Sequence, residues 1–120
     1  MAKLMVTILQ IRSFIDEARH IDQQPELLPD EMQRIKQLAL ERLLINLGEA
    51  TTRIPESEKN KFPDVPWRDI SAFRNVLVHD YEGINATIIR DILDSDKLNI
   101  MLDAVNQLNP DIEQVRRSNR

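Results

Sequence analysis

The segment from Arg74 to Tyr81 concentrates side chains that can do chemistry. Within eight residues it holds a permanent cation, an amide, an imidazole and the only tyrosine of the chain: Arg74, Asn75, His79 and Tyr81. An arginine and a histidine suffice for metal-free RNA cleavage, because the histidine can take a proton from the 2′-hydroxyl or give one to the leaving oxygen. The guanidinium can pair with phosphate and stabilise the charge added in the transition state. Since only RNA supplies that internal nucleophile, a site built from this pair would make the protein a ribonuclease.

The geometry of one helix does not complete such a site. Arg74 and His79 are five positions apart, which places them about 140° apart around an ideal helix. A two-fold dimer would place both copies of each residue around one cleft and double the local positive charge. A site is therefore possible in a homodimer, if His79 lies at a helix end and the second copy contributes its own Arg74 and His79.

A structural interpretation of the same residues stays open at this point. Arg74 can be a surface ion-pair partner of Asp69 or Asp80, and His79 a helix C-terminal residue favoured by the helix dipole. The ring of Tyr81 can pack with its hydroxyl in water. Glu49 follows a helix glycine and can either hold Arg74 or remain a surface charge.

Composition narrows the remaining possibilities. The chain has 120 residues, no cysteine and a net charge of −4. The absence of cysteine excludes a disulfide framework, a thiolate zinc site and a cysteine nucleophile. The acidic balance argues against a broad basic footprint for nucleic acid. No metal and no cofactor are expected, and with no targeting or membrane segment visible we expect a cytoplasmic protein.

Helical periodicity dominates the first half of the chain. A first helix is expected to end near Asp22, and a second to run from Glu31 to Arg53 with Asp30 as its N-cap. Leucines and isoleucines wrap most of the second helix, so it is either central in a bundle or shared between a core and a partner. Gly48 within it indicates close packing. The face of the first helix is formed by Leu4, Ile8, Ile11, Ile15 and Ala18.

The second half reads as further helices separated by proline, glycine and serine. At most one helical turn is expected across Glu56–Lys61, and a third helix from Trp67 to His79. Gly83 is expected to break the chain before a fourth helix that starts near Asn85. A cap or kink at Ser95 precedes a last helix. Together these elements predict an all-α bundle of four to five helices.

The motif and its surroundings resemble a known family. Arg74 to Tyr81 resembles the R-x4-H-x-Y motif of HEPN-domain proteins, specifically the HepT-like ribonuclease toxins that are paired with a minimal nucleotidyltransferase antitoxin. The resemblance continues in Asn46–Ala50, which reads NLGEA, in the Pro-Trp segment Phe62–Ile70 and in Glu82–Asn85. It covers about residues 4–108.

The resemblance implies an up-and-down HEPN bundle over residues 1–110, with a frayed tail over 111–120. It implies a toxin that cleaves tRNA or mRNA at a dimer-interface cleft, with Arg74 and His79 as catalytic residues and Asn75 in support. Silencing would come from AMPylation of Tyr81 by the nucleotidyltransferase. The alternative is a non-catalytic helical dimer that binds nucleotide and docks that partner.

Overall fold

Helix α1 (Ala2–Asp22) forms where apolar residues recur every three or four positions. The structure is a computed structural model that describes residues 2–24, 29–79 and 82–108. Ile8, Ile11 and Ile15 are fully buried on one face of α1. Both the predicted face and the predicted end of this helix are confirmed.

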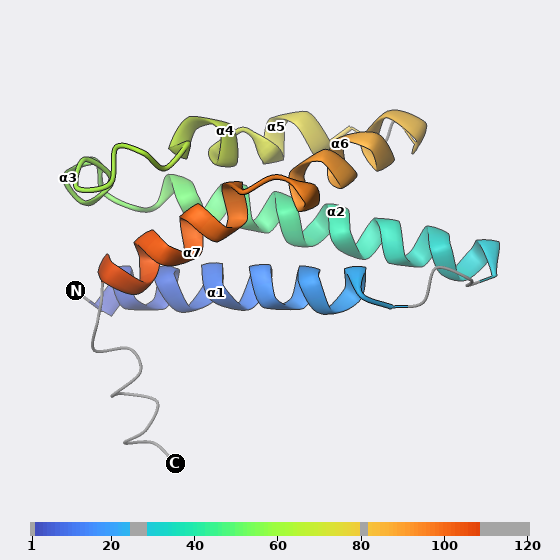
Figure 1. Ribbon diagram of the computed structural model, residues 1–120, viewed down its shortest axis with the longest axis horizontal. Helices are drawn as coiled ribbons and strands as arrows, with labels where there is room; N and C mark the ends of the chain where they lie inside the picture. The colour runs from blue at the N-terminus through green and yellow to red at the C-terminus, as the bar shows by residue number, and fades with distance from the viewer. Residues whose placement is uncertain (1, 25–28, 80–81, 109–120) are drawn as a thin grey trace, which may run out of the picture.

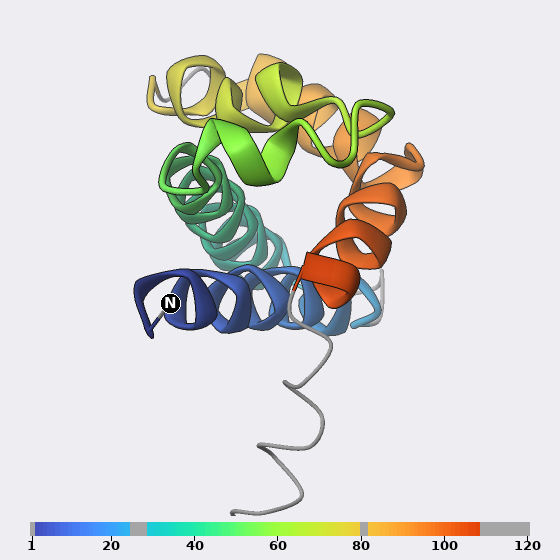
Figure 2. The same ribbon diagram turned by 90° about the vertical axis from the view of Figure 1, so that its left-hand side faces the viewer.

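Helix α2 (Asp30–Thr52) is the central element of the bundle. It contacts α1, α4, α5 and α6, and Figures 1 and 2 show it between α1 below and the α4–α5 segment above. Most apolar side chains of its second half are buried, whereas Met32, Ile35 and Leu38 in its first half are exposed. The expected cap is wrong: Pro29 holds the N-cap position, and Asp30 is already helical without a side-chain capping hydrogen bond.

The segment after α2 forms three short helices, α3 (Glu56–Lys59), α4 (Trp67–Ser71) and α5 (Phe73–Leu77). The single turn at α3 was predicted, but one continuous helix from Trp67 to His79 was wrong. A turn at Ala72 separates α4 from α5, and α5 ends at Leu77. The turn lies where Gly48 of α2 approaches the backbone of Ile70, Ser71 and Arg74.

Helices α6 (Glu82–Asp94) and α7 (Lys97–Leu108) complete the bundle. The expected break at Gly83 is wrong, because Gly83 lies in the first turn of α6 and costs a helix only about 1 kcal/mol there. Ser95 separates the two helices as expected. Its hydroxyl donates to the Ile92 carbonyl at 2.7 Å and accepts from the Lys97 backbone N–H at 3.3 Å.

In the end-on view of Figure 2, α1, α2, the α4–α5 segment and α7 lie around four sides of the bundle. The predicted all-α class is confirmed, and every regular element of the described residues is a helix. None of these helices is long and apolar enough to cross a membrane. The expected tail, residues 111–120, lies outside the described residues.

One ion pair fastens the end of α1 to α6. The guanidinium of Arg90 donates to both carboxylate oxygens of Asp22, at 2.9 Å each, and also pairs with Asp94 in its own helix. The hydrogen bond from Arg90 is the main cause that lowers the pKa of Asp22, against the opposing effect of burial. The same contact raises the pKa of Arg90. This bidentate geometry is the strong form of an arginine–carboxylate pair.

Candidate active site

Three of the predicted site residues meet in one hollow of the surface. Glu49 from α2 and Arg74 and Asn75 from α5 line a cavity of about 380 Å³. Thr52, Arg53 and Ser71 complete its wall. Residues 49 and 74 are far apart in the chain, and the packing of α2 against α5 brings them together.

Arg74 and Glu49 form an ion pair across this hollow. Arg74 Nε lies 2.9 Å from Glu49 Oε1, and the two side chains remain 57% and 43% exposed. The contact therefore holds the guanidinium at its Nε edge while much of the group faces solvent. Of the partners considered for Arg74, Asp69 instead pairs with Lys97 at 3.6 Å, and Asp80 lies outside the described residues.

Gly48 allows α2 to approach the backbone that carries Arg74. A Cβ atom at Gly48 would lie 3.0 Å from the Ile70 carbonyl oxygen, 3.1 Å from the Arg74 backbone nitrogen and 3.2 Å from the Ser71 carbonyl oxygen. These are backbone atoms, which cannot move aside as a flexible side chain can. The close packing predicted for this glycine is confirmed, and it sets the position of the first turn of α5.

His79 lies in the bend that follows α5. Its carbonyl oxygen accepts a hydrogen bond of 2.7 Å from Asn85 Nδ2, and the Leu77 carbonyl lies 3.4 Å from the same nitrogen. The last carbonyls of a helix lack partners within the helix, and Asn85 provides one for α5. The side chain of His79 is on the exposed surface.

A second residue fixes Asn85 in turn. Asn85 is fully buried, and its Nδ2 also donates to Glu41 Oε1 at 2.5 Å. Glu41, on α2, is 6% exposed. The His79 bend is thus tied to the central helix through two buried polar side chains, a residue of α6 and a residue of α2.

Neither Asn85 nor Glu41 was singled out from the sequence as a site residue. The signal that could have identified them is a polar residue within an apolar stripe. Asn85 shares a helix face with Ile88, Ile89 and Ile92. A polar side chain at such a position is buried and requires a hydrogen-bond partner.

The described residues do not gather the whole motif in one hollow. His79 is not among the side chains that line the cavity of Glu49, Arg74 and Asn75. Tyr81 lies outside the described residues.

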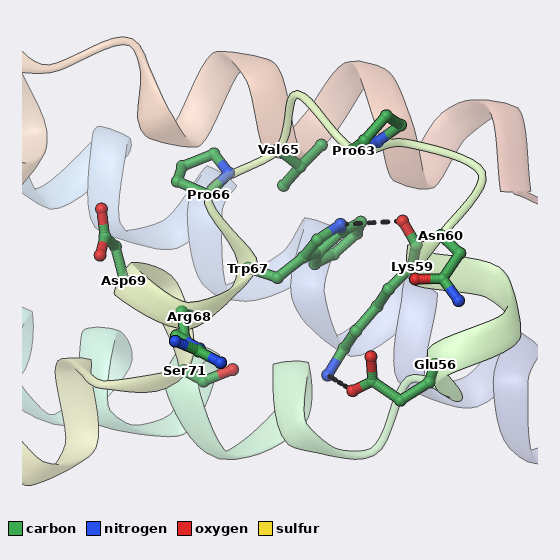
Figure 3. Close-up of a pocket in the computed structure, with 10 residues that line it drawn as sticks. All are labelled: Glu56, Lys59, Asn60, Pro63, Val65, Pro66, Trp67, Arg68, Asp69 and Ser71. Carbon is green, nitrogen blue, oxygen red and sulfur yellow. Dashed lines mark hydrogen bonds and ion pairs between the residues drawn. The ribbon is translucent and has the colours of Figure 1, made fainter.

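A second hollow lies under the segment that joins α3 to α4 (Figure 3). It measures about 590 Å³, and its lining includes Glu56, Lys59 and Trp67. The Lys59 ammonium is paired with Glu56 at 3.5 Å. The indole N–H of Trp67 donates to the Lys59 and Phe62 carbonyls, so it holds the loop together. Because no residue of the Arg74–Tyr81 segment lines this hollow, the hollow at Arg74 is the better candidate site.

No metal centre is apparent in the described part of the chain. Histidine and carboxylate side chains there do not gather in threes in a way that could hold an ion. The side chains of the predicted site that line the hollow are Arg74, Asn75 and Glu49, which supply a guanidinium, an amide and a carboxylate.

Comparison with known proteins assigns the chain to a family. A protein of Methanocaldococcus jannaschii named "Putative RNase MJ0127" is 46% identical over 57 residues, which are 48% of this chain and 47% of the relative. The "Probable ribonuclease HepT" of Thermococcus cleftensis is 36% identical over 53 residues, 44% of this chain and 48% of the relative.

These alignments span about half the length of the curated relatives. No solved structure matches the chain. A family model described as "Ribonuclease HepT-like" matches residues 6–115, which include α2, the candidate site and the Arg74–His79 segment. The chain therefore belongs to the HepT-like ribonuclease family.

Proposed function

We propose that this protein is a metal-independent endoribonuclease, the toxin of a HEPN/nucleotidyltransferase toxin–antitoxin pair. The observation that carries the proposal is the solvent-facing Arg74, held at its Nε edge by Glu49 beside Asn75. Membership of a ribonuclease family supports the reaction class. The substrate is tRNA or mRNA.

The reaction uses the 2′-hydroxyl of RNA as its nucleophile. The imidazole of His79 takes the proton from that hydroxyl as the 2′-oxygen attacks the adjacent phosphorus. The bond from phosphorus to the 5′-oxygen breaks, and the leaving oxygen receives a proton from a protonated imidazole. The products are a 2′,3′-cyclic phosphate and a 5′-hydroxyl, and general acid–base catalysis of this kind contributes about 10²–10⁴-fold.

Arg74 stabilises the charge that develops on the phosphate. Glu49 contacts Nε, and the terminal nitrogens of the guanidinium carry four further N–H donors for the nonbridging oxygens. Asn75 is the next residue on α5 and lines the same hollow. Its amide supplies a further neutral donor to the phosphate.

A dimer brings two copies of Arg74 and His79 to one cleft. Its support is three exposed apolar side chains within five positions of His79 in the sequence: Val76, Val78 and Ile84 are 45%, 53% and 61% exposed. Contact with a second copy would remove such side chains from water. Two imidazoles in the cleft can divide the roles of base and acid. Sedimentation should give twice the chain mass of 14.0 kDa.

Regulation acts at Tyr81, two residues after His79. AMPylation by the cognate nucleotidyltransferase adds bulk and negative charge to a side chain two positions from His79, where RNA phosphate must approach. Co-expression with that partner should raise the intact mass in AMP-sized steps. The Tyr81→Phe protein should show no such rise, and a rise in that variant would exclude Tyr81 as the acceptor.

The chemistry of the products tests the reaction class. Cleaved RNA should end in a 2′,3′-cyclic phosphate, and an oligonucleotide with 2′-deoxyribose at the cleaved position should remain intact. Cleavage of the deoxy substrate would exclude the 2′-hydroxyl mechanism. If RNA is bound but never cut, the alternative of a non-catalytic dimer that binds nucleotide and docks the transferase is favoured.

A further inference from the structure

Arg53 lies between two hollows on one side of the bundle. It follows the last residue of α2 as its C-cap. It lines the 380 Å³ cavity that holds Arg74, and it also lines a neighbouring cavity of about 770 Å³ formed with α1. The second cavity is bounded by Lys3, Val6, Thr7 and Gln10 of α1. Arg53 therefore connects the candidate site to a groove along α1.

Arg53 contacts a neutral side chain, whereas Arg74 and Arg90 are paired with carboxylates. Its Nη2 donates to the neutral amide oxygen of Gln10 at 2.9 Å. Arg74 and Arg90, in contrast, pair with carboxylates. Within the described part of the chain, no ion pair compensates Arg53, so its full positive charge remains available to a ligand.

The two hollows together are basic although the chain as a whole carries a net charge of −4. Their lining residues include three cations, Lys3, Arg53 and Arg74, and a single carboxylate, Glu49. That carboxylate is already paired with Arg74. The local field in a groove, and not the total charge, decides whether a polyanion is attracted there.

We propose that Arg53 binds a backbone phosphate of the RNA strand outside the scissile position, and that the strand continues along the α1 groove past Lys3. This inference rests on the proposed ribonuclease function. The Gln10 amide positions the guanidinium without neutralising it, as a phosphate site requires. An RNA strand is favoured over a single nucleotide because Arg53 lines both the Arg74 cavity and a second, larger one. Phosphate contacts of this kind set affinity and register and carry no sequence preference.

The test measures RNA affinity in a His79→Ala background, so that cleavage does not remove the ligand. The probe is a labelled single-stranded RNA longer than the roughly 4–16 nucleotides that single-strand sites cover. Arg53→Gln should weaken binding about tenfold at low salt. The slope of log affinity against log salt should become shallower by about 0.7, as expected for one lost phosphate contact on a single strand.

Arg90→Gln is the matched control, because it removes the same charge from an arginine that two carboxylates already compensate. It should leave both affinity and salt slope unchanged. If Arg53→Gln has no more effect than Arg90→Gln, the proposed phosphate site is wrong. AMP and inorganic phosphate serve as competitors: displacement of the RNA at equimolar AMP would show a nucleotide site and overturn the strand assignment.

A substitution at Gln10 tests the charge of Arg53 without changing Arg53 itself. Gln10→Glu places a carboxylate where the amide now accepts from Arg53, and it should weaken RNA binding about as much as Arg53→Gln. Gln10→Ala removes the contact but not the charge and should have a much smaller effect. Equal affinities for both Gln10 variants would overturn the proposal. Cleavage by the protein with His79 intact is measured in parallel, so that failure of the proposed function is recognised separately.

Discussion

The buried side-chain amide of Asn85 donates to the backbone carbonyl of His79 at 2.7 Å. The same nitrogen donates to the Glu41 carboxylate on α2. The candidate general base is thus positioned by its backbone, through a side chain of α6, against the central helix of the bundle. Catalytic geometry is sensitive to displacements of about 1 Å, so this link between the core and the motif has consequences that can be measured.

Replacing Asn85 should impair both folding and activity. Asn85→Ala leaves a buried carboxylate and the His79 carbonyl without their donor, which costs about 1–3 kcal/mol in free energy of unfolding. RNA cleavage should fall further than this loss of stability explains. Denaturant unfolding gives the first quantity and an RNA cleavage assay well below the melting temperature gives the second.

A core variant of similar stability separates positioning from general destabilisation. Ile15→Val removes one buried methyl group of α1 and costs about 0.5–1.5 kcal/mol, yet it touches nothing near the motif. Its cleavage rate should match that of the unmodified protein. Glu41→Gln retains an oxygen acceptor for Asn85, so its cleavage rate should lie between those of Asn85→Ala and Ile15→Val. If Asn85→Ala and Ile15→Val have the same activity, Asn85 has only a structural role.

The ion pair at Arg74 predicts an order of activities. Glu49→Gln removes the charge that orients the guanidinium but keeps all the donors of Arg74, so the cleavage rate should fall by about tenfold or less. Arg74→Lys keeps the charge but not the planar donors and should cost more. Steady-state cleavage of a short RNA measures both. A Glu49→Gln protein less active than Arg74→Lys would contradict a supporting role for Glu49.

Replacing each of the two glycines with alanine should change the stability of the fold in opposite directions. Gly48→Ala places a Cβ within 3.0–3.2 Å of three backbone atoms and should destabilise the fold by about 1–3 kcal/mol despite better helix propensity. Gly83→Ala meets nothing within 4 Å and should stabilise α6 by up to about 1 kcal/mol. Chemical denaturation of both proteins measures the contrast. A stabilising Gly48→Ala would show that α2 does not pack against α4 and α5 as described.

The Asp22–Arg90 pair predicts a pH dependence of stability. The pKa of Asp22 is lowered in the folded state, so folding favours the ionised carboxylate. This stabilisation is complete above the unfolded-state pKa of about 4 and is lost as the pH falls through the lower folded-state value. Asp22→Asn should therefore cost about 1 kcal/mol at neutral pH and nothing in strong acid. A difference that persists unchanged in acid would contradict the pair.

The sequence predicts those parts of the structure that depend on the spacing of apolar residues along the chain. The face and end of α1 follow from the spacing of Ile8, Ile11 and Ile15, and the all-α class follows from the same periodicity along the chain. The sequence left two interpretations of Glu49 open, a partner of Arg74 or a surface charge. The structure contains the ion pair between Glu49 and Arg74.

Features that depend on distant partners were missed. The turn at Ala72 interrupts a pattern that reads as one helix, and it lies where Gly48 of α2 meets the backbone of α4 and α5. Asn85 marks the start of the predicted fourth helix, but its hydrogen-bond partner Glu41 is separated from it by 44 positions. A local pattern contains no information on which buried polar groups meet.

Cleavage of RNA in excess chelator tests the central claim most directly. The unmodified protein should cut RNA without added metal, while Arg74→Ala reduces the rate by about 10²–10³-fold and His79→Ala by about 10²–10⁴-fold, both with unchanged helical content by circular dichroism. Cleavage that survives either substitution, or that requires a divalent metal ion, would contradict the assignment of Arg74 and His79 as the catalytic pair.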